Sequence, residues 1–259
     1  GRHKPLGDLS QPNTTLPIPN RMEGENPSLT PQAGHLYVVA TPIGNLTDLT
    51  DRARALLERV DAVACEDTRV GGALLSKLGI KNRLVAYHDN NEASMAATLA
   101  SRLEAGESIA VISDAGTPAI SDPGFRLTRE CHKRGLTIVP VPGACAATAL
   151  LSASGLPSNG FLFVGFLPPK SAARRRFIRE HIDFPYTIIL YESCHRIEKL
   201  MAEMVDLLDG ERCVCLCPEI TKRFETIRSG TLKDVSQTFK DGRKKGEFVV
   251  IIAPGKFTL

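Results

Sequence analysis

A run of carboxylates, small residues and prolines occupies positions 112–124, which read Ile-Ser-Asp-Ala-Gly-Thr-Pro-Ala-Ile-Ser-Asp-Pro-Gly. It directly follows the apolar run 108–112, which predicts a buried strand. Ligands of open α/β sheets bind at the carboxyl ends of the strands. Glycine lets backbone approach a ligand closely, and proline stiffens the path. The loop is therefore predicted to form part of a binding site, with an ordinary tight turn as the alternative.

Other loops with polar side chains follow further predicted strands. Loop 41–46 follows strand 36–40, loop 66–69 follows strand 62–65, and loop 88–92 follows strand 84–87. Strands that alternate with helices predict a mostly parallel sheet, along one edge of which these loops would meet. The candidates on this edge for accepting a proton are Glu66, Asp67, His88, Asp89 and Glu92. A structural role as a loop cap stays open for each acid.

The elements that position these loops fall into two halves of the chain. Helical spacing in the first half predicts helices at 50–60, 71–78, 93–103, 125–134 and 145–153, with a further strand at 136–139. In the second half, strands are predicted at 161–166, 187–191, 212–217, 225–228 and 248–253, and helices around 170–179, at 195–208 and at 232–240. The run 155–158 interrupts the pattern and is the predicted domain boundary.

The predicted organisation is thus two α/β domains, 34–155 with a mostly parallel sheet and 156–259 with a mixed sheet. Residues 1–33 are rich in Pro, Asn and Thr and are predicted to be a disordered leader. No apolar run is long enough to span a membrane and no signal peptide is evident. A cytoplasmic protein without a membrane partner is therefore predicted. The net charge of +3 permits an anionic partner without demanding one.

The seven cysteines are an odd number, which favours reduced thiols over a disulfide framework. Cys213, Cys215 and Cys217 alternate, so a strand would point all three to one face. Their spacing is not that of a CxxC metal site, and we predict core residues and no metal. The sequence also lacks the GxGxxG, P-loop, GxSxG and HExxH motifs. An ordinary dinucleotide site, a class I methyltransferase, a P-loop NTPase and two common hydrolase types are thereby disfavoured.

The loops match a known family in their chain order. The matching blocks are Thr41-Pro42-Ile43-Gly44-Asn45-Leu46, Glu66-Asp67-Thr68-Arg69, residues 88–92, 113–118, 122–124, 141–143, 165–168, 191–196, 219–222 and 245–247. Together they resemble the ribosomal RNA small subunit methyltransferase I family, within the tetrapyrrole methylase superfamily. The resemblance runs from about His35 to Ala253.

The resemblance implies a class III, tetrapyrrole methylase-like methyltransferase that binds S-adenosylmethionine in the cleft between its two domains, as a homodimer. The implied activity is 2′-O-methylation of a cytidine ribose in the decoding region of 16S ribosomal RNA in the small ribosomal subunit. The implied cofactor contacts are Pro42, Asp114, Ala115, Gly116, Thr117, Ile120, Ser121, Pro142, Gly143, Ala144 and Ala146.

Basic side chains are the candidate contacts to RNA phosphates. They are Arg69, Lys170, Arg174, Arg175, Arg176, Arg179 and Lys222, with Arg223, Arg243, Lys244 and Lys245 as further candidates. A merely solvated basic face is the alternative. Because aromatic residues are only 5% of the chain and no RRM-like signature occurs, recognition of RNA by shape is favoured over base stacking.

Two other functions stay open at this point. A tetrapyrrole C-methyltransferase is one, but loop 41–45 differs from the GxGPGD-type loop that those relatives usually carry. An inactive, ribosome-associated cofactor-binding module is the other, and the intact acidic loops argue against it. The chain departs from the family at Ala40 and Cys194, where relatives often carry Pro and Thr. It also stops soon after strand 248–253, whereas many relatives add a small helical segment.

Overall fold

Five short apolar runs of the first half form a parallel sheet in the computed structural model, which describes residues 29–240 and 246–259. The strands are β1 (His35–Val39), β2 (Ala62–Cys65), β3 (Leu84–Ala86), β4 (Ile109–Ile112) and β5 (Thr137–Val141). β2 and β4 are buried along their whole length, as expected of parallel strands covered on both faces. The predicted leader lies outside the described residues, apart from positions 29–33.

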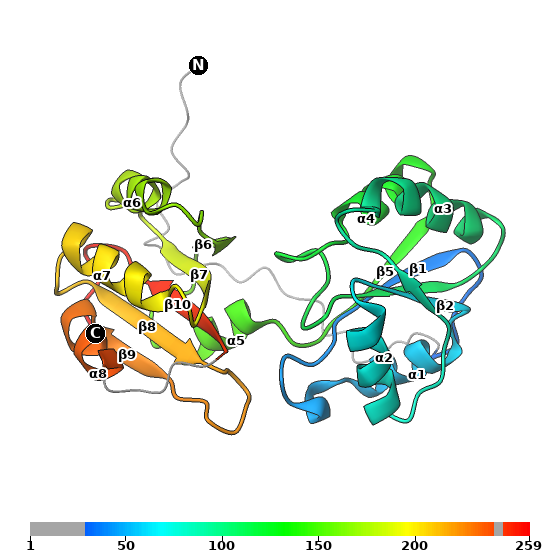
Figure 1. Cartoon of the computed structure of the whole chain (residues 1–259), viewed down its shortest axis with the longest axis horizontal. Coiled ribbons are helices and arrows are strands. Elements are labelled where there is room, and N and C mark those ends of the chain that lie inside the picture. The colour runs from blue at the N-terminus through cyan, green and yellow to red at the C-terminus, as the bar shows by residue number, and fades with distance from the viewer. Residues whose placement is uncertain (1–28, 241–245) are drawn as a thin grey trace, which may run out of the picture.

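Helices cover both faces of this sheet (Figure 1). They are α1 (Asp51–Arg59), α2 (Thr68–Lys77), α3 (Glu92–Glu104) and α4 (Phe125–Lys133). The apolar stripes of α1 and α2 pack on one face, and those of α3 and α4 pack on the other. The α1 helix begins where the sequence predicts, because the Thr50 hydroxyl accepts a hydrogen bond from the backbone N–H of Ala53 at 3.1 Å.

The strands lie in the order β3-β2-β4-β1-β5, and β1 and β4 are neighbours from which the chain continues toward opposite edges of the sheet. From β1 the chain runs toward β3 through helices on one face. From β4 it runs toward β5 through α4 on the other face. Such a reversal opens a crevice outside the carboxyl ends of the two neighbouring strands, where ligands bind. Thr41 and Gly116 exchange backbone hydrogen bonds of 2.9 and 3.1 Å there, which joins the loops that leave β1 and β4.

The second half forms a mixed sheet in the order β6-β7-β10-β8-β9. Its strands are β6 (Phe161–Phe166), β7 (Thr187–Ser193), β8 (Cys213–Pro218), β9 (Arg228–Thr231) and β10 (Glu247–Ile252). β6 and β7 are parallel, whereas the other neighbouring pairs are antiparallel. The two sheets confirm the predicted fold class.

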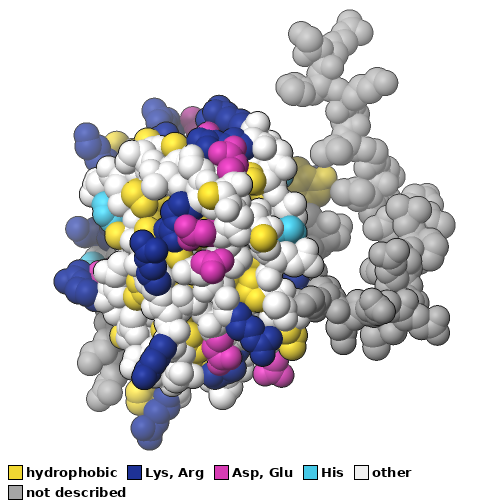
Figure 2. Space-filling model, turned by 90° about the vertical axis from the view of Figure 1, so that its right-hand side faces the viewer, with side chains coloured by type: hydrophobic (Ala, Val, Ile, Leu, Met, Phe, Trp, Pro, Cys, Tyr) yellow, Lys and Arg dark blue, Asp and Glu magenta, His cyan; other side chains and the backbone are white. Residues whose placement is uncertain are grey.

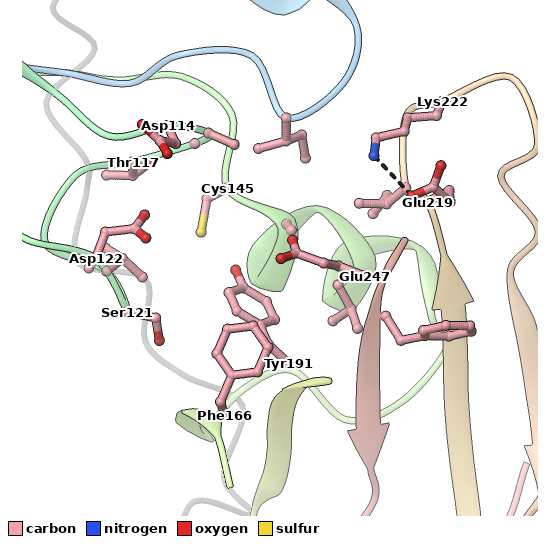
Figure 3. A pocket seen from close by; sticks show the side chains of 18 of the residues that line it. Asp114, Thr117, Ser121, Asp122, Cys145, Phe166, Tyr191, Glu219, Lys222 and Glu247 are labelled. Carbon is pink, nitrogen blue, oxygen red and sulfur yellow. Dashed lines mark hydrogen bonds and ion pairs between the residues drawn. The ribbon is translucent and has the colours of Figure 1, made fainter. Parts of the chain in front are cut away.

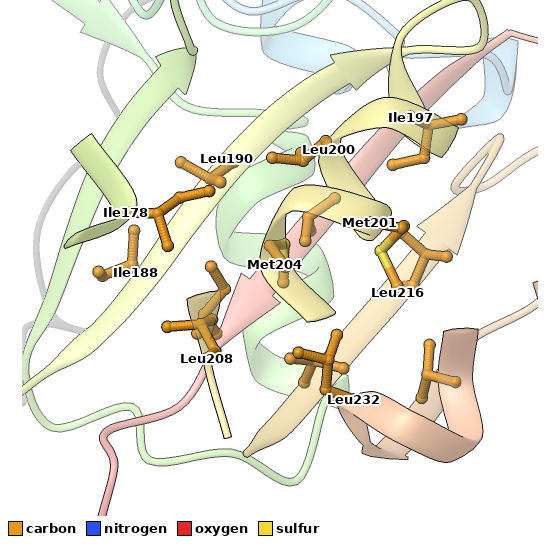
Figure 4. Packing of buried hydrophobic residues seen from close by; sticks show 14 of the residues in the cluster. Ile178, Ile188, Leu190, Ile197, Leu200, Met201, Met204, Leu208, Leu216 and Leu232 are labelled. Atoms are coloured by element: carbon orange, nitrogen blue, oxygen red, sulfur yellow. The ribbon is translucent and has the colours of Figure 1, made fainter. Parts of the chain in front are cut away.

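Opposite faces of the second sheet are covered very differently. The helices α6 (Ser171–Glu180), α7 (Ile197–Leu207) and α8 (Leu232–Lys240) follow β6, β7 and β9. They pack Ile178, Leu200 and Leu232 with other apolar side chains on one face (Figure 4). Of the described helices, only α5 (Ala146–Ala153) covers the other face, where Cys213, Cys215 and Cys217 lie in the same apolar cluster. In the described part of the chain, no group of three or more metal-ligating side chains comes together.

Two predictions need revision. The short strand predicted at 225–228 lies at 228–231, because Glu225 instead closes a turn by accepting a hydrogen bond from the Thr221 backbone N–H. The boundary predicted after residue 155 places α5 with the first sheet, but α5 packs against β7 and β10. We therefore propose that the boundary lies between β5 and α5.

None of the described helices combines the length and apolar character needed to cross a membrane.

Candidate active site

A cavity of about 290 Å³ lies between the two sheets, beside the crevice at β1 and β4 (Figure 3). This volume is at the lower end of the range of small-molecule sites. Its first wall, from the first sheet and the segment that follows, contains Ile43, Glu66, residues 114–117 and 120–122, Cys145 and Ala146. Its second wall, from the second sheet, contains Phe166, Tyr191, Glu219, Ile220, Lys222 and residues 247–249.

The first wall is held in shape by hydrogen bonds within and next to the loop 113–124. The Thr117 hydroxyl donates to the Ala144 carbonyl at 3.0 Å, which ties the loop to the segment before α5. Ala119 and Ser121 have φ values of 66° and 60°, in the left-handed region that residues with a side chain rarely adopt. Such strain persists only where the surroundings impose it, and it gathers at functional sites.

The second wall shows the same pattern of strain and support. Glu219 and Thr221 have φ values of 53° and 66°, and with Ala119 and Ser121 they are all the non-glycine residues of positive φ in the described chain. The Lys222 ammonium pairs with the Glu219 carboxylate at 2.9 Å. The Tyr191 hydroxyl oxygen accepts a hydrogen bond of 3.1 Å from the backbone N–H of Ala147, and burial raises the pKa of Tyr191 well above its usual range.

The two walls contact each other at the cavity rim. The Thr221 hydroxyl donates to the Asp48 carboxylate, on the loop after β1, at 2.7 Å. Nearby, a Cβ on Gly44 would lie only 2.5 Å from Cγ of Lys222, so this close approach requires glycine. These contacts fix the loops 41–50 and 219–222 against each other.

Among the residues that the structure describes, the cavity lining carries an excess of negative charge. Its carboxylates are Glu66, Asp114, Asp122, Glu219 and Glu247, and its one described basic side chain is Lys222. Burial, reinforced by the charges of Asp114 and Glu247, raises the pKa of Asp122 to about 6. Burial and the neighbouring acids likewise raise the pKa of Glu66. Carboxylates crowded in this way favour a cationic ligand, which would relieve their repulsion.

The predicted cofactor contacts fall into two groups. Asp114, Ala115, Gly116, Thr117, Ile120, Ser121 and Ala146 line the cavity, whereas Pro42, Pro142, Gly143 and Ala144 do not. The second group supports the wall instead: Ala144 accepts the Thr117 hydroxyl, and a Cβ on Gly143 would lie 2.9 Å from that of Ala40. Contact of the first group with a cofactor stays a prediction.

Among the predicted proton acceptors, Glu66 lines the cavity and Asp67 does not. Asp67 caps α2 by accepting the backbone N–H of Arg69 at 2.8 Å, and its carboxylate also binds the Arg69 guanidinium at 2.7 Å. The hydrogen bonds from Arg69 lower the pKa of Asp67 to about 2. A carboxylate with so low a pKa is a weak base at neutral pH. Its geometry is that of a helix cap.

Glu92 was also predicted as a proton acceptor, and the structure gives it a structural role. Its carboxylate accepts hydrogen bonds from the Tyr87 hydroxyl at 2.9 Å and from the backbone N–H groups of Gly124 and Arg126, both at 3.3 Å. Burial alone would raise the pKa of Glu92, but these hydrogen bonds outweigh it and the pKa is lowered. Glu92 therefore holds the start of α4 and does not line the cavity.

His88 does not line the cavity, although it lies close enough to Glu66 to lower that carboxyl's pKa when charged. Its Nδ1 atom is buried and has no hydrogen-bond partner among the residues that the structure describes. Asp89, beside it, is exposed. A role for His88 in positioning substrate stays a prediction.

The basic helix α6 requires a correction. Arg174 was predicted to contact phosphate, but only 2% of its surface is exposed. Its guanidinium forms a bidentate ion pair with the Glu203 carboxylate of α7, with N–O distances of 2.8 and 2.9 Å. Helical spacing places Arg174 on the same face as the buried Ile178, against α7. Arg175 pairs with Asp206, and Arg176 lies 4.0 Å from Glu180.

The exposed basic residues in and next to α6 are Lys170, Arg176 and Arg179. The helix α6 packs on one face of the second sheet, and the Tyr191 side chain lies on the opposite face. The candidates Arg243, Lys244 and Lys245 lie outside the described residues. Arg69 and Lys77 line a second, more open hollow of about 570 Å³ that shares Asp114 with the cavity wall. On the face of the first half that Figure 2 shows, Lys and Arg alternate with Asp and Glu rather than forming a basic patch.

The cavity residues that sequence reasoning missed include Asp122, Phe166, Tyr191 and Glu247. Each lies in a sequence block that was singled out, so a signal existed. Glu247 of β10 pairs with Ser193 of the neighbouring strand β7, and this register puts Tyr191 and Glu247 on the same face of the sheet. Only this register, between strands far apart in sequence, shows that they face the same cavity.

Comparison with known proteins places the chain among methyltransferases. The model of the tetrapyrrole (corrin/porphyrin) methylases matches residues 35–236. The ribosomal RNA small subunit methyltransferase I of Pasteurella multocida is 50% identical over 85% of this chain and 79% of its own length. The protein of the same name from Escherichia coli O157:H7 is 47% identical, over 85% and 77% of the two chains.

Solved structures agree on the fold. A uroporphyrin-III C-methyltransferase from Thermus thermophilus, solved in complex with S-adenosylhomocysteine, has a TM-score of 0.56 at 20% identity, over 85% of this chain and 97% of that one. A diphthine synthase has a TM-score of 0.65 at 15% identity, over 85% and 90%. At this level of identity the likeness concerns the fold.

Proposed function

Because the chain belongs to the tetrapyrrole methylase family, and within it to the ribosomal RNA small subunit methyltransferase I family, we propose that it methylates the 2′-hydroxyl of a cytidine in the decoding region of 16S ribosomal RNA. The chain is an S-adenosylmethionine-dependent methyltransferase. Methylation of ribosomal RNA follows from relatives of this name at 47 to 50% identity. The ribose position, the cytidine and the decoding region are the finer part of the proposal.

The cavity residues fit S-adenosylmethionine. The cofactor carries a sulfonium, an ammonium and a carboxylate group and is positive overall, and the cavity offers Glu66, Asp114 and Asp122 from one wall and Glu247 from the other. The cofactor has no phosphate, and the described lining of the cavity has no glycine-rich phosphate loop and a single basic side chain. When bound, it supplies a methyl group already activated by its attachment to sulfur. This charge match is the structural observation that carries the proposal.

The protein's own part is to align the ribose oxygen, exclude water and accept a proton. Phe166 and Tyr191 supply an apolar edge, with their rings 5.9 Å apart. Asp122 points into the cavity between the two walls (Figure 3). We assign proton acceptance to Asp122, because a pKa of about 6 leaves it ionised and basic at neutral pH. The charge of Asp122 in turn contributes to the raised pKa of Glu66.

The proposed partner is 16S ribosomal RNA, free or within the small ribosomal subunit, and we propose that a homodimer binds it. A tetrapyrrole substrate is the second candidate, since structural neighbours include uroporphyrin-III C-methyltransferases. Their 20 and 18% identity shows the fold alone. An inactive cofactor-binding module is the third.

One experiment separates these candidates. The protein is incubated with methyl-labelled S-adenosylmethionine and either unmethylated small ribosomal subunits or uroporphyrinogen. Label in 16S RNA at a nucleotide whose 3′ linkage has become resistant to alkali supports ribose 2′-O-methylation. Label on a base would leave RNA methylation but refute the ribose position. Label only in the porphyrinogen, or cofactor binding without transfer to either, would refute the proposal.

A further inference from the structure

The loop between β8 and β9 leaves the cavity wall and continues into solvent. Ile220 and Lys222 line the cavity, and residues 222–227 are then all exposed. At their centre, Phe224 is 71% exposed, more than any other large hydrophobic side chain in the described chain. We call residues 222–227 the exposed tip. An aromatic ring held in water beside an active site is unfavourable unless a ligand covers it.

The exposed tip is anchored at its base. The Thr221 hydroxyl binds Asp48 across the cavity rim at 2.7 Å, and the Thr221 backbone N–H donates to Glu225 at 2.5 Å. The backbone N–H groups of Lys222 and Glu225 donate to the carbonyls of Glu219 and Lys222, each at 3.0 Å. The base is thus two consecutive turns fastened to the opposite wall. Ordering the tip on a ligand would therefore cost little conformational entropy.

The charges of the loop leave one cation available. Glu219 neutralises Lys222, and Glu225 is engaged by the Thr221 backbone. In the described part of the chain, ion pairs involve Lys222 but not Arg223, whose guanidinium lies 5.6 Å from the centre of the Phe224 ring. The exposed tip thus presents an aromatic ring and a guanidinium side by side. Single-stranded RNA is bound by this combination, because bases stack on aromatic faces and on arginine planes while phosphates pair with the cation.

We propose that the exposed tip binds single-stranded RNA beside the target nucleotide, with Phe224 stacking on a neighbouring base and Arg223 contacting a phosphate or extending the stack. The inference rests on the proposed RNA substrate, adds a recognition element outside the cavity, and departs at this one position from the expectation that RNA shape is recognised rather than stacked bases. A protein partner fits less well. Phe224 and the half-exposed Ile227 are the large apolar side chains here, and a ring offers at most about 250 Å² where a stable interface needs about 800 Å² per partner.

The test uses the full chain and two RNA probes: unmethylated small ribosomal subunits for activity, and a fluorescent 12-nucleotide oligocytidine for affinity. Phe224→Ala is expected to weaken oligocytidine binding about tenfold, the usual loss when one stacking side chain is removed. Phe224→Tyr should restore binding, whereas Phe224→Leu, which is apolar without a π face, should not. Arg223→Gln should reduce the salt dependence of binding by about one unit of slope. Phe161→Ala, at the exposed start of β6, is the matched control and should bind as the wild type does.

Affinity for S-adenosylmethionine, measured by calorimetry, should be the same in all these variants, and it also reports correct folding. Unchanged RNA affinity in Phe224→Ala, or full rescue by Phe224→Leu, would overturn the stacking role. A change in oligomeric state of Phe224→Ala on sedimentation would instead show that the ring packs against a second copy, and would overturn the inference. Failure of the wild type to bind either RNA would refute the proposed function itself, and this inference with it.

Discussion

Two regions of the molecule bury charge in opposite ways. Beneath α6, Arg174 and Glu203 satisfy each other, and the remaining atoms bind Ser171 at 2.6 Å and the Pro169 carbonyl at 2.7 Å. In the cavity, Glu66 and Asp122 face other carboxylates, and the pKa of each is raised. A buried charge that the protein itself compensates stabilises the fold. A buried charge that the protein leaves uncompensated marks where a ligand supplies the opposite charge.

The largest effect is expected at the compensated pair. Arg174→Met would leave Glu203 buried without its partner and should lower the free energy of unfolding by about 3–5 kcal/mol. Arg176→Met, on the exposed side of the same helix, is the control and should change it by less than about 1 kcal/mol. Urea unfolding measures both. Equal stability of the two variants would remove the distinction drawn between these arginines.

The next largest effect is expected at Glu92, where a substitution tests whether the carboxylate has a structural or a catalytic role. Glu92→Gln weakens the hydrogen bonds from Tyr87 and from the start of α4, and should cost about 2 kcal/mol of stability. Methyl transfer by the folded fraction should be unchanged at saturating substrate. Asp89→Asn, at an exposed position of the same loop 88–92, controls for charge. A large loss of turnover without loss of stability would return Glu92 to the catalytic candidates.

A smaller effect of opposite sign is expected at Asp122. A raised pKa means that the folded protein holds a proton that the unfolded chain releases, so wild-type stability falls as pH rises from about 4 through about 6. Asp122→Asn avoids this loss and should be more stable above pH 7. The shift from 3.8 to about 6 sets a ceiling of about 3 kcal/mol, and partial exposure reduces the expected gain to about 1–2 kcal/mol.

The same variant should lose methyl transfer and its rise in rate through about pH 6. Unfolding followed at pH 3.5 and pH 7.5 should show no gain at the lower pH and the full gain at the higher. If the variant is less stable than the wild type at pH 7.5, the protein does compensate the charge of Asp122, contrary to this prediction. Unaltered turnover across the pH range would remove it as proton acceptor.

The smallest effect is expected at Asp67. Because its carboxylate lies outside the cavity lining, keeps a low pKa and binds Arg69 and the start of α2, Asp67→Asn should change turnover by less than about twofold. Glu66→Gln, at the adjacent residue that does line the cavity, is the comparison and should reduce turnover more. The rate of label transfer to small subunits measures both, and a reversed order would exchange their roles.

The fold could largely be predicted from local patterns. The strands at 62–65 and 161–166 were predicted at the observed bounds, because each is a short apolar run with turn residues on both sides. Thr50 marks the start of α1 for a similarly local reason. The strand β9 was misplaced by three residues, because the turn that displaces it depends on a hydrogen bond from Thr221 to Glu225.

The candidate site was harder to predict, because its charges are sorted by contacts distant in sequence. Three consecutive arginines, 174–176, look alike in the sequence, and only Glu203 on another helix identifies the buried one. The i, i+4 relation of Arg174 to Ile178 was an available hint. Asp122 resembles the other loop acids until Glu247, from the second sheet, is brought to the same cavity.

The position of β10 has a consequence for the order in which this enzyme is made. β10 follows all other described strands along the chain, yet it lies inside its sheet, between β7 and β8. During synthesis the parallel sheet can fold as soon as β5 has emerged, since domains fold as units from the N-terminus. The second sheet, and with it the cavity wall at 247–249, must wait for the last strand. An interrupted translation product would therefore contain a folded first half, unpaired edges on β7 and β8 prone to aggregation, and no methyltransferase activity.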